Sequence, residues 1–189
     1  MDLAGAPFSI TIGNLFVGTP LPDLLRSVCE YVASFKLAPK PQETIHHRVP
    51  FGREFELLWR SDFDPVAGWC RRNEKKTAYV KQRFKVFGRD AAGSLYGLWI
   101  FKRGVTAEQA PVAVLDAEFI EDSVVAANLR DFLGYLAADE NSKYDNAAFR
   151  EWLAATHGIK PLDATVADAA RKSYPQFAHW TQRNIGKSF

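Results

Sequence analysis

Apolar positions along this chain follow two patterns, and each pattern predicts one kind of secondary structure. In Leu21–Phe35 and in Leu129–Leu136 apolar residues recur every three or four positions, which is the spacing of a helix. Tyr79–Phe87 alternates apolar with basic residues and predicts a strand. Leu95–Phe101 and Val112–Leu115 are apolar on both faces, which is typical of strands in the middle of a covered sheet.

The N-terminal segment predicts a β-hairpin. Phe8–Ile12 alternates apolar and polar residues, and Gly13-Asn14 follows as a dipeptide that favours a two-residue turn into a second strand. The surrounding run Leu3–Pro22 carries no charge, but prolines and polar residues interrupt it and no basic segment precedes it. We therefore expect neither a signal peptide nor a membrane-spanning helix here, and we expect a cytoplasmic protein without membrane contacts.

The C-terminal third predicts helices. One surrounds Phe149–Leu153 and ends at Gly158, and another begins at Asp163 and is bent or broken at Pro175. Phe51–Trp59 fits either a strand or a short helix.

Strands clustered between helices, rather than alternating with them, indicate an α+β fold. We expect a mainly antiparallel central sheet flanked by helices. Residues 1–189 form one domain in this interpretation, with a core at 1–138 and a C-terminal helical extension at 139–189.

Composition adds few constraints. The chain has 189 residues and a formal net charge of +2, which is too small to imply nucleic acid as a partner. Its two cysteines, Cys29 and Cys70, both stand in apolar surroundings, and we expect buried free thiols, as in a reducing compartment.

No pattern in the sequence predicts an active site, a metal site or a cofactor. Asp116 and Glu118, two residues apart at the end of a strand, are the best candidates for a catalytic carboxylate pair, but no second motif accompanies them. His46 and His47 are adjacent and would point apart in an extended chain, so we expect surface roles for the histidines. The glycines from Gly88 onward match no phosphate-binding loop, and we expect turns and close packing within the sheet.

Charge is divided unevenly along the chain. A basic stretch runs from Arg71 to Arg89 and is interleaved with aromatic residues, a pattern that some single-strand nucleic-acid binders share. We favour a solvated edge over a nucleic-acid site. Residues 105–151 contain ten acidic and three basic residues, so the chain is dipolar, and such polarity can steer a charged partner.

Between Phe87 and Ala137 the sequence contains, in this order, a Gly-Asp turn, a Pro-Val strand with a following acid, and a helix with a Phe-Leu pair. The residues in these places are Gly88, Asp90, Gly93, Tyr96, Pro111, Val112, Glu118, Phe132 and Leu133. This stretch resembles the SUKH superfamily, which includes yeast glucan-synthesis regulators and many bacterial toxin-immunity proteins. Ala91 and Ala92 stand where the family has glycine.

The resemblance implies a non-enzymatic protein-binding domain, most often an immunity protein that binds and neutralises a cognate bacterial toxin. The alternatives are a cytosolic scaffold or regulator of the same fold, an enzyme that uses Asp116 and Glu118, and a nucleic-acid binder. We expect a protein partner, a toxin domain, at the acidic segment of Asp116, Glu118, Glu121 and Asp122, because loops at sheet ends vary freely. The oligomeric state stays open.

Overall fold

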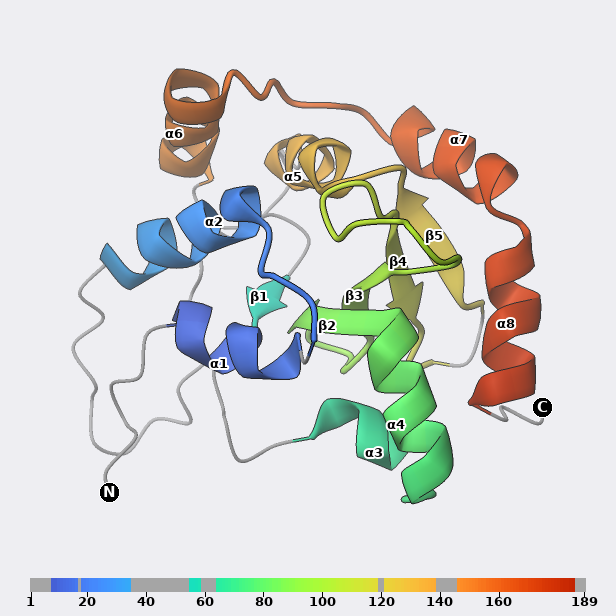
Figure 1. Ribbon diagram of the computed structural model, residues 1–189. Coiled ribbons are helices and arrows are strands. Elements are labelled where there is room, and N and C mark those ends of the chain that lie inside the picture. The colour runs from blue at the N-terminus through green and yellow to red at the C-terminus, as the bar shows by residue number, and fades with distance from the viewer. Residues whose placement is uncertain are drawn as a thin grey trace.

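The computed structural model describes residues 8–16, 18–34, 55–58, 64–118, 121–138 and 146–185. At its centre is a five-stranded sheet in which each strand pairs with the next along the chain, always antiparallel (Figure 1). The strands are β1 (Glu56–Leu57), β2 (Phe84–Arg89), β3 (Leu95–Trp99), β4 (Val112–Leu115) and β5 (Ser123–Ala126). The predicted α+β fold and its antiparallel sheet are confirmed.

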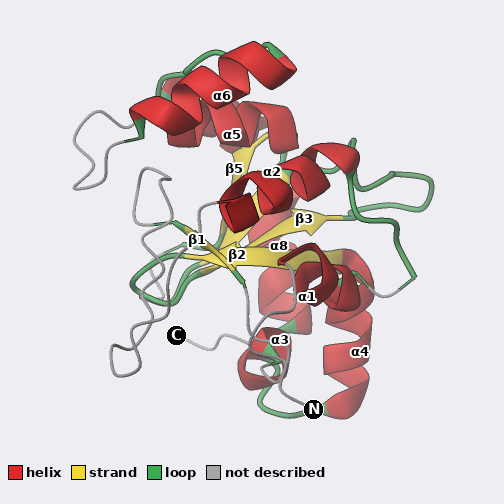
Figure 2. Ribbon diagram, turned by 90° about the vertical axis from the view of Figure 1, so that its left-hand side faces the viewer, coloured by secondary structure: helices red, strands yellow, loops and turns green. Residues whose placement is uncertain are grey.

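Helices cover both faces of this sheet, as the doubly apolar strands predict. The helices are α1 (Phe8–Leu15), α2 (Asp23–Ser34), α3 (Pro65–Trp69), α4 (Glu74–Arg83), α5 (Leu129–Ala137), α6 (Ala147–His157), α7 (Thr165–Ser173) and α8 (Gln176–Asn184). Side chains of α1, α2, α5 and α6 join one hydrophobic cluster, and side chains of α3, α4, α7 and α8 join a second. In Figure 2 the sheet lies between two pairs of helices, with α5 and α6 on one side and α3 and α4 on the other.

Phe132 is the centre of the first cluster. It is 0% exposed, and its ring lies 5.3 Å from the ring of Phe55, 5.7 Å from that of Phe87 and 5.6 Å from that of Tyr96. Its helix α5 begins where the sequence predicts, because the Asn128 side chain accepts a hydrogen bond from the backbone N–H of Asp131. The predicted packing of this helix on the sheet is confirmed.

Two glycines let aromatic rings lie directly on the backbone of the sheet. A Cβ atom on Gly88 would stand 2.2 Å from Cζ of Phe55, and one on Gly97 would stand 2.7 Å from Cζ of Phe84. Neither ring could keep its position if these residues carried a side chain. The predicted close approach within the sheet is therefore confirmed.

The predicted N-terminal hairpin is wrong, because Phe8–Leu15 forms helix α1. Ile12 within the helix and Phe16 directly after it are 0% and 1% exposed, and both belong to the first hydrophobic cluster. Gly13, the expected turn residue, lies inside the helix. Burial of Ile12 and Phe16 outweighed the local preference of Gly-Asn for a turn.

The strand predicted at Tyr79–Phe87 is also wrong in its first half. Residues up to Arg83 form the last turns of α4, and β2 begins only at Phe84. The helix is started by Asn73, whose side chain accepts a hydrogen bond from the backbone N–H of Lys76. This cap, strand β5 and helix α8 are not among the elements predicted from the sequence. The sequence of Phe51–Trp59 fits either a strand or a short helix, and in the structure Glu56–Leu57 within this range forms strand β1.

The C-terminal helices complete the second hydrophobic cluster. The helical segment is interrupted at Pro175, as predicted, and α8 begins directly after it. Phe177 of α8 is 1% exposed. The Phe177 ring lies 4.9 Å from that of Trp99 on β3 and 6.1 Å from that of Phe84 on β2. Figure 1 shows α7 and α8 beside β5. The segment expected as an extension is thus part of the hydrophobic core of the fold.

Candidate functional site

The acidic loop, residues 116–122, connects β4 to β5 and contains all four predicted partner-binding residues. Its first residue, Asp116, folds the loop back on itself. One carboxylate oxygen of Asp116 accepts the backbone N–H of Glu118 at 3.1 Å, and the other accepts the backbone N–H of Glu121 at 3.1 Å. Asp116 therefore shapes the loop that follows it.

A second carboxylate closes the base of the acidic loop. Asp122 is 8% exposed, and its carboxylate accepts the backbone N–H of Asp116 at 2.8 Å. The hydroxyl of Ser94, which belongs to the turn before β3, accepts the backbone N–H of Ala117 at 3.2 Å. Charge-assisted hydrogen bonds to backbone N–H groups are stronger than neutral ones, so the carboxylates of Asp116 and Asp122 hold the backbone at Asp116, Glu118 and Glu121.

The four predicted residues thus divide into two pairs. Glu118 and Glu121 are exposed and turn their carboxylates to solvent. Asp122 is too deeply buried to present a surface to a partner, and Asp116 is half-buried with both oxygens bonded to the loop backbone. Of the four predicted carboxylates, only those of Glu118 and Glu121 are therefore on the surface. Those of Asp116 and Asp122 bond the backbone of the loop instead.

This geometry also bears on the idea of a catalytic carboxylate pair. In a glycosidase two carboxyl groups face one substrate from opposite sides of the reacting bond. Asp116 instead directs its oxygens at its own loop, including the N–H of Glu118, its supposed partner. The arrangement is that of a loop-forming aspartate.

The basic stretch is dispersed by the fold. Lys81 pairs with Asp64 at 2.5 Å, and Arg89 pairs with Glu56 across β1 and β2. Lys85 is 1% exposed on β2, and burial lowers the pKa of its ammonium group. The basic residues at the beginning of the stretch are exposed around the start of α4, and they are Arg71, Arg72, Lys75 and Lys76.

The acidic loop and helix α4 adjoin opposite ends of the sheet. The loop follows Leu115, which pairs with Leu95 at the start of β3. Helix α4 leads into Phe84, which pairs with Trp99 at the other end of β3. The basic end of α4 is therefore not beside the acidic loop and does not cancel its charge locally.

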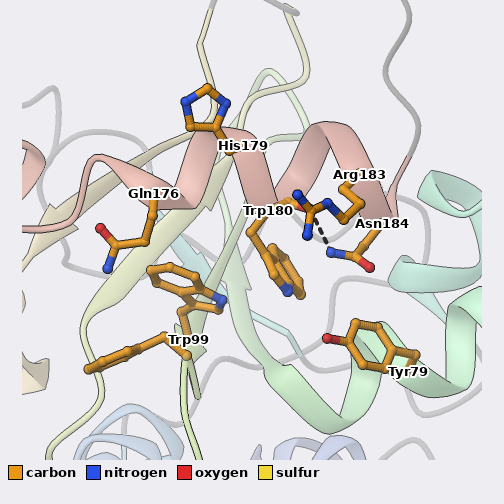
Figure 3. A pocket seen from close by; sticks show the side chains of 8 residues that line it. Tyr79, Trp99, Gln176, His179, Trp180, Arg183 and Asn184 are labelled. Carbon is orange, nitrogen blue, oxygen red and sulfur yellow. Dashed lines mark hydrogen bonds between the residues drawn. The ribbon is translucent and has the colours of Figure 1, made fainter.

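A second candidate site lies at the Trp99 end of the sheet. Here a pocket of about 330 Å³ opens between α4, the end of β3 and α8. Figure 3 shows the side chains around it, which are Tyr79, Trp99, Phe101, Gln176, His179, Trp180, Arg183 and Asn184. No pattern in the sequence predicts this pocket, because its walls come from three segments that are far apart in the chain.

The histidines in the described part of the chain have different surroundings. His157 is half-buried, lies 2.9 Å from the Ser27 hydroxyl through Nε2, and meets the Trp152 ring edge-on at 5.0 Å. Burial and the nearby charge of Arg130 lower the pKa of this imidazole. His179 is exposed at the pocket. The predicted pair His46 and His47 lies outside the described residues.

The described residues contain neither a cluster suited to a metal ion nor a helix suited to a membrane. No group of three or more His, Cys, Asp and Glu side chains is arranged to hold a metal ion there. No helix among the described segments is both long and apolar enough to cross a membrane. Comparisons of the chain with family models, with curated proteins and with solved structures found no match.

Proposed function

We propose that this chain is a non-enzymatic protein-binding domain that acts in the cytoplasm as an immunity protein, binding and neutralising a cognate bacterial toxin. The observation that carries the proposal is the acidic loop. Glu118 and Glu121 face solvent from a backbone that Asp116 and Asp122 hold in place. Residues whose backbone is already held by hydrogen bonds lose less conformational freedom when a partner docks.

The resemblance to the SUKH superfamily supplies the biological role in this proposal. Several residues that carry it have structural tasks in the fold. The Asp90 carboxylate accepts the backbone N–H of Ser94 at 2.9 Å and holds the turn between β2 and β3. Tyr96 and Phe132 pack ring to ring at 5.6 Å between sheet and helix. A family motif made of such contacts is consistent with a shared scaffold whose loops carry the specificity.

Charge indicates the class of toxin. Toxins that act on nucleic acid have basic clefts, because their substrate is a polyanion. The two exposed carboxylates of Glu118 and Glu121 complement such a cleft, and long-range attraction would speed the encounter. Since α4 leads into the opposite end of the sheet, its exposed lysines do not stand between the acidic loop and a basic partner.

The proposal is tested by co-expressing this chain in a bacterial host with the proteins encoded by the genes adjacent to its own, among which the proposal expects a toxin. We expect the chain to restore growth and to form a stable complex with the toxin. A variant that carries Glu118→Lys and Glu121→Lys should lose protection, because both exposed charges of the loop are reversed while the residues that shape it remain.

A matched control separates the loop from overall charge. Glu108→Lys and Glu151→Lys reverse two carboxylates that are also exposed but lie outside the acidic loop, before β4 and on α6. We expect this control to protect as the parent chain does. If none of the proteins encoded by the adjacent genes binds the chain, the immunity role is wrong, and a scaffold or regulatory role of the same fold takes its place.

A further inference from the structure

The pocket between α4, β3 and α8 has aromatic walls. Tyr79 is 41% exposed and is the one large hydrophobic residue classed as exposed in the described part of the chain. Across the pocket stand Trp99 and Trp180, with ring centres 5.9 Å apart, and Phe101 lies 5.6 Å from Trp99. The volume of about 330 Å³ falls at the small end of the range for ligand pockets. Walls of this kind and this size suit a single planar ring system.

One wall of the pocket holds a buried hydrogen-bond donor. Trp99 is 2% exposed, and among the described residues its indole Nε1–H has no hydrogen-bond acceptor. Indole nitrogen is a donor only, and a buried donor without an acceptor is costly, so an acceptor atom on a ligand would remove that cost. In Figure 3 this nitrogen points toward the Trp180 side of the pocket.

The polar side chains around the pocket favour negative charge. Arg183 is an exposed guanidinium on α8, and none of the lining residues is Asp or Glu. Lys75 and Lys76 are exposed on α4, four and three positions before Tyr79, so they share its side of the helix. The side-chain amide nitrogen of Asn184 donates a hydrogen bond to the backbone oxygen of Trp180 at 2.8 Å. The side-chain oxygen of Asn184 takes no part in that bond.

From these observations we infer that the pocket is a binding site for a small planar aromatic ligand that carries an anionic group. The ring lies between Tyr79 and Trp180, the acceptor atoms meet Trp99 Nε1, and the negative charge faces Arg183. This site is independent of the proposed immunity role, because it lies at the end of the sheet away from the acidic loop.

The ligand class is tested with four probes, followed by tryptophan fluorescence and titration calorimetry on the full chain. Indole-3-acetate carries a ring and a carboxylate, and adenosine monophosphate carries a ring and a phosphate. Indole and tryptamine are the neutral and cationic counterparts of the first. We expect saturable binding of at least one anion, about tenfold or more tighter than tryptamine, and the stronger of the two anions identifies the source as carboxylate or phosphate.

Variants assign the binding to this pocket. Arg183→Gln should weaken the anion about tenfold and leave indole unchanged, and Trp180→Ala should weaken both. Trp99→Phe keeps a ring but removes the donor, and it should weaken the anion if circular dichroism shows an intact fold. Lys172→Gln, an equal loss of charge on α7, is the control and should change nothing.

The inference is overturned if neither anion binds saturably at millimolar concentration, if tryptamine binds as well as the anions, or if Arg183→Gln and Lys172→Gln have the same effect. None of these measurements involves a toxin. Failure of the immunity proposal therefore leaves the result for the pocket unchanged.

Discussion

The carboxylate of Asp122 accepts the backbone N–H of Asp116 across the base of the acidic loop, at 2.8 Å and with Asp122 only 8% exposed. In the sequence both residues look like surface charges beside a strand. In the fold they form the frame from which Glu118 and Glu121 project. This relationship separates two carboxylates that bond the loop backbone from two that are exposed, and it decides which substitutions test recognition and which test folding.

Replacing Gly88 and Gly13 by alanine should have opposite effects on stability. Gly88→Ala places a Cβ atom 2.2 Å from the Phe55 ring and should cost about 1–3 kcal/mol, as overpacking does. Gly13 lies within α1 and a Cβ there meets nothing within 4 Å, so Gly13→Ala should stabilise the fold by about 0.5–1 kcal/mol. Urea denaturation measures both. A destabilising Gly13→Ala would contradict helix α1 and revive the hairpin.

Phe132→Ala should cost about 3–5 kcal/mol of unfolding free energy, because it removes a fully buried ring that three other aromatic rings contact. Tyr79→Ala is the matched aromatic truncation at an exposed position and should cost far less. The comparison is made from denaturant midpoints of the two variants. Equal losses would show that Phe132 is not central to the core.

The two thiols should be inert in the folded protein. Cys29 is 1% exposed, and burial raises the pKa of its thiol to about 12, while burial also raises the pKa of the Cys70 thiol. Only the thiolate reacts with disulfide reagents. At pH 8 Ellman's reagent should therefore react with both thiols in the denatured protein. In the folded protein it should react with each of them far more slowly. Rapid reaction of a native thiol would place that cysteine outside the core.

His157 should make the fold less stable in mild acid. Its pKa lies below the usual 6.5 in the folded chain, because burial and the charge of Arg130 disfavour the protonated ring. The unfolded chain therefore takes up a proton at a higher pH than the folded chain does. Stability is unaffected by this group above about pH 6.5 and falls as the pH drops from there through the folded pKa.

His157→Gln removes the titrating group and should flatten this dependence. Urea midpoints of parent and variant at pH 7.5 and pH 5.0 provide the measurement. An unchanged difference between the two pH values would assign the acid sensitivity to other groups.

Elements with a strong local signal could be predicted from the sequence. The apolar runs of β3 and β4, the helical stripe of α2 and the Asn128 cap of α5 each act within a few residues. Helix α1 could not, because its sequence also fits a hairpin and only contacts with α2 and the sheet decide between the two.

The candidate sites were harder to predict than the fold. The burial of Asp122 depends on the path of its own loop, which the pattern of charges does not reveal. The aromatic pocket depends on α8 returning to the end of β3, so that Trp180 meets Trp99 although they are far apart in the chain. Patterns within one segment of the sequence carry no information about contacts between segments that are far apart in the chain.

The association rate of the chain with the toxin identified by the co-expression test, measured by stopped-flow at low and moderate salt, tests the central claim most directly. If the acidic loop is the recognition surface, the Glu118→Lys, Glu121→Lys variant associates at least about tenfold more slowly than the Glu108→Lys, Glu151→Lys control at low salt, and added salt narrows the difference. Equal rates for the two variants at both salt concentrations would contradict the claim.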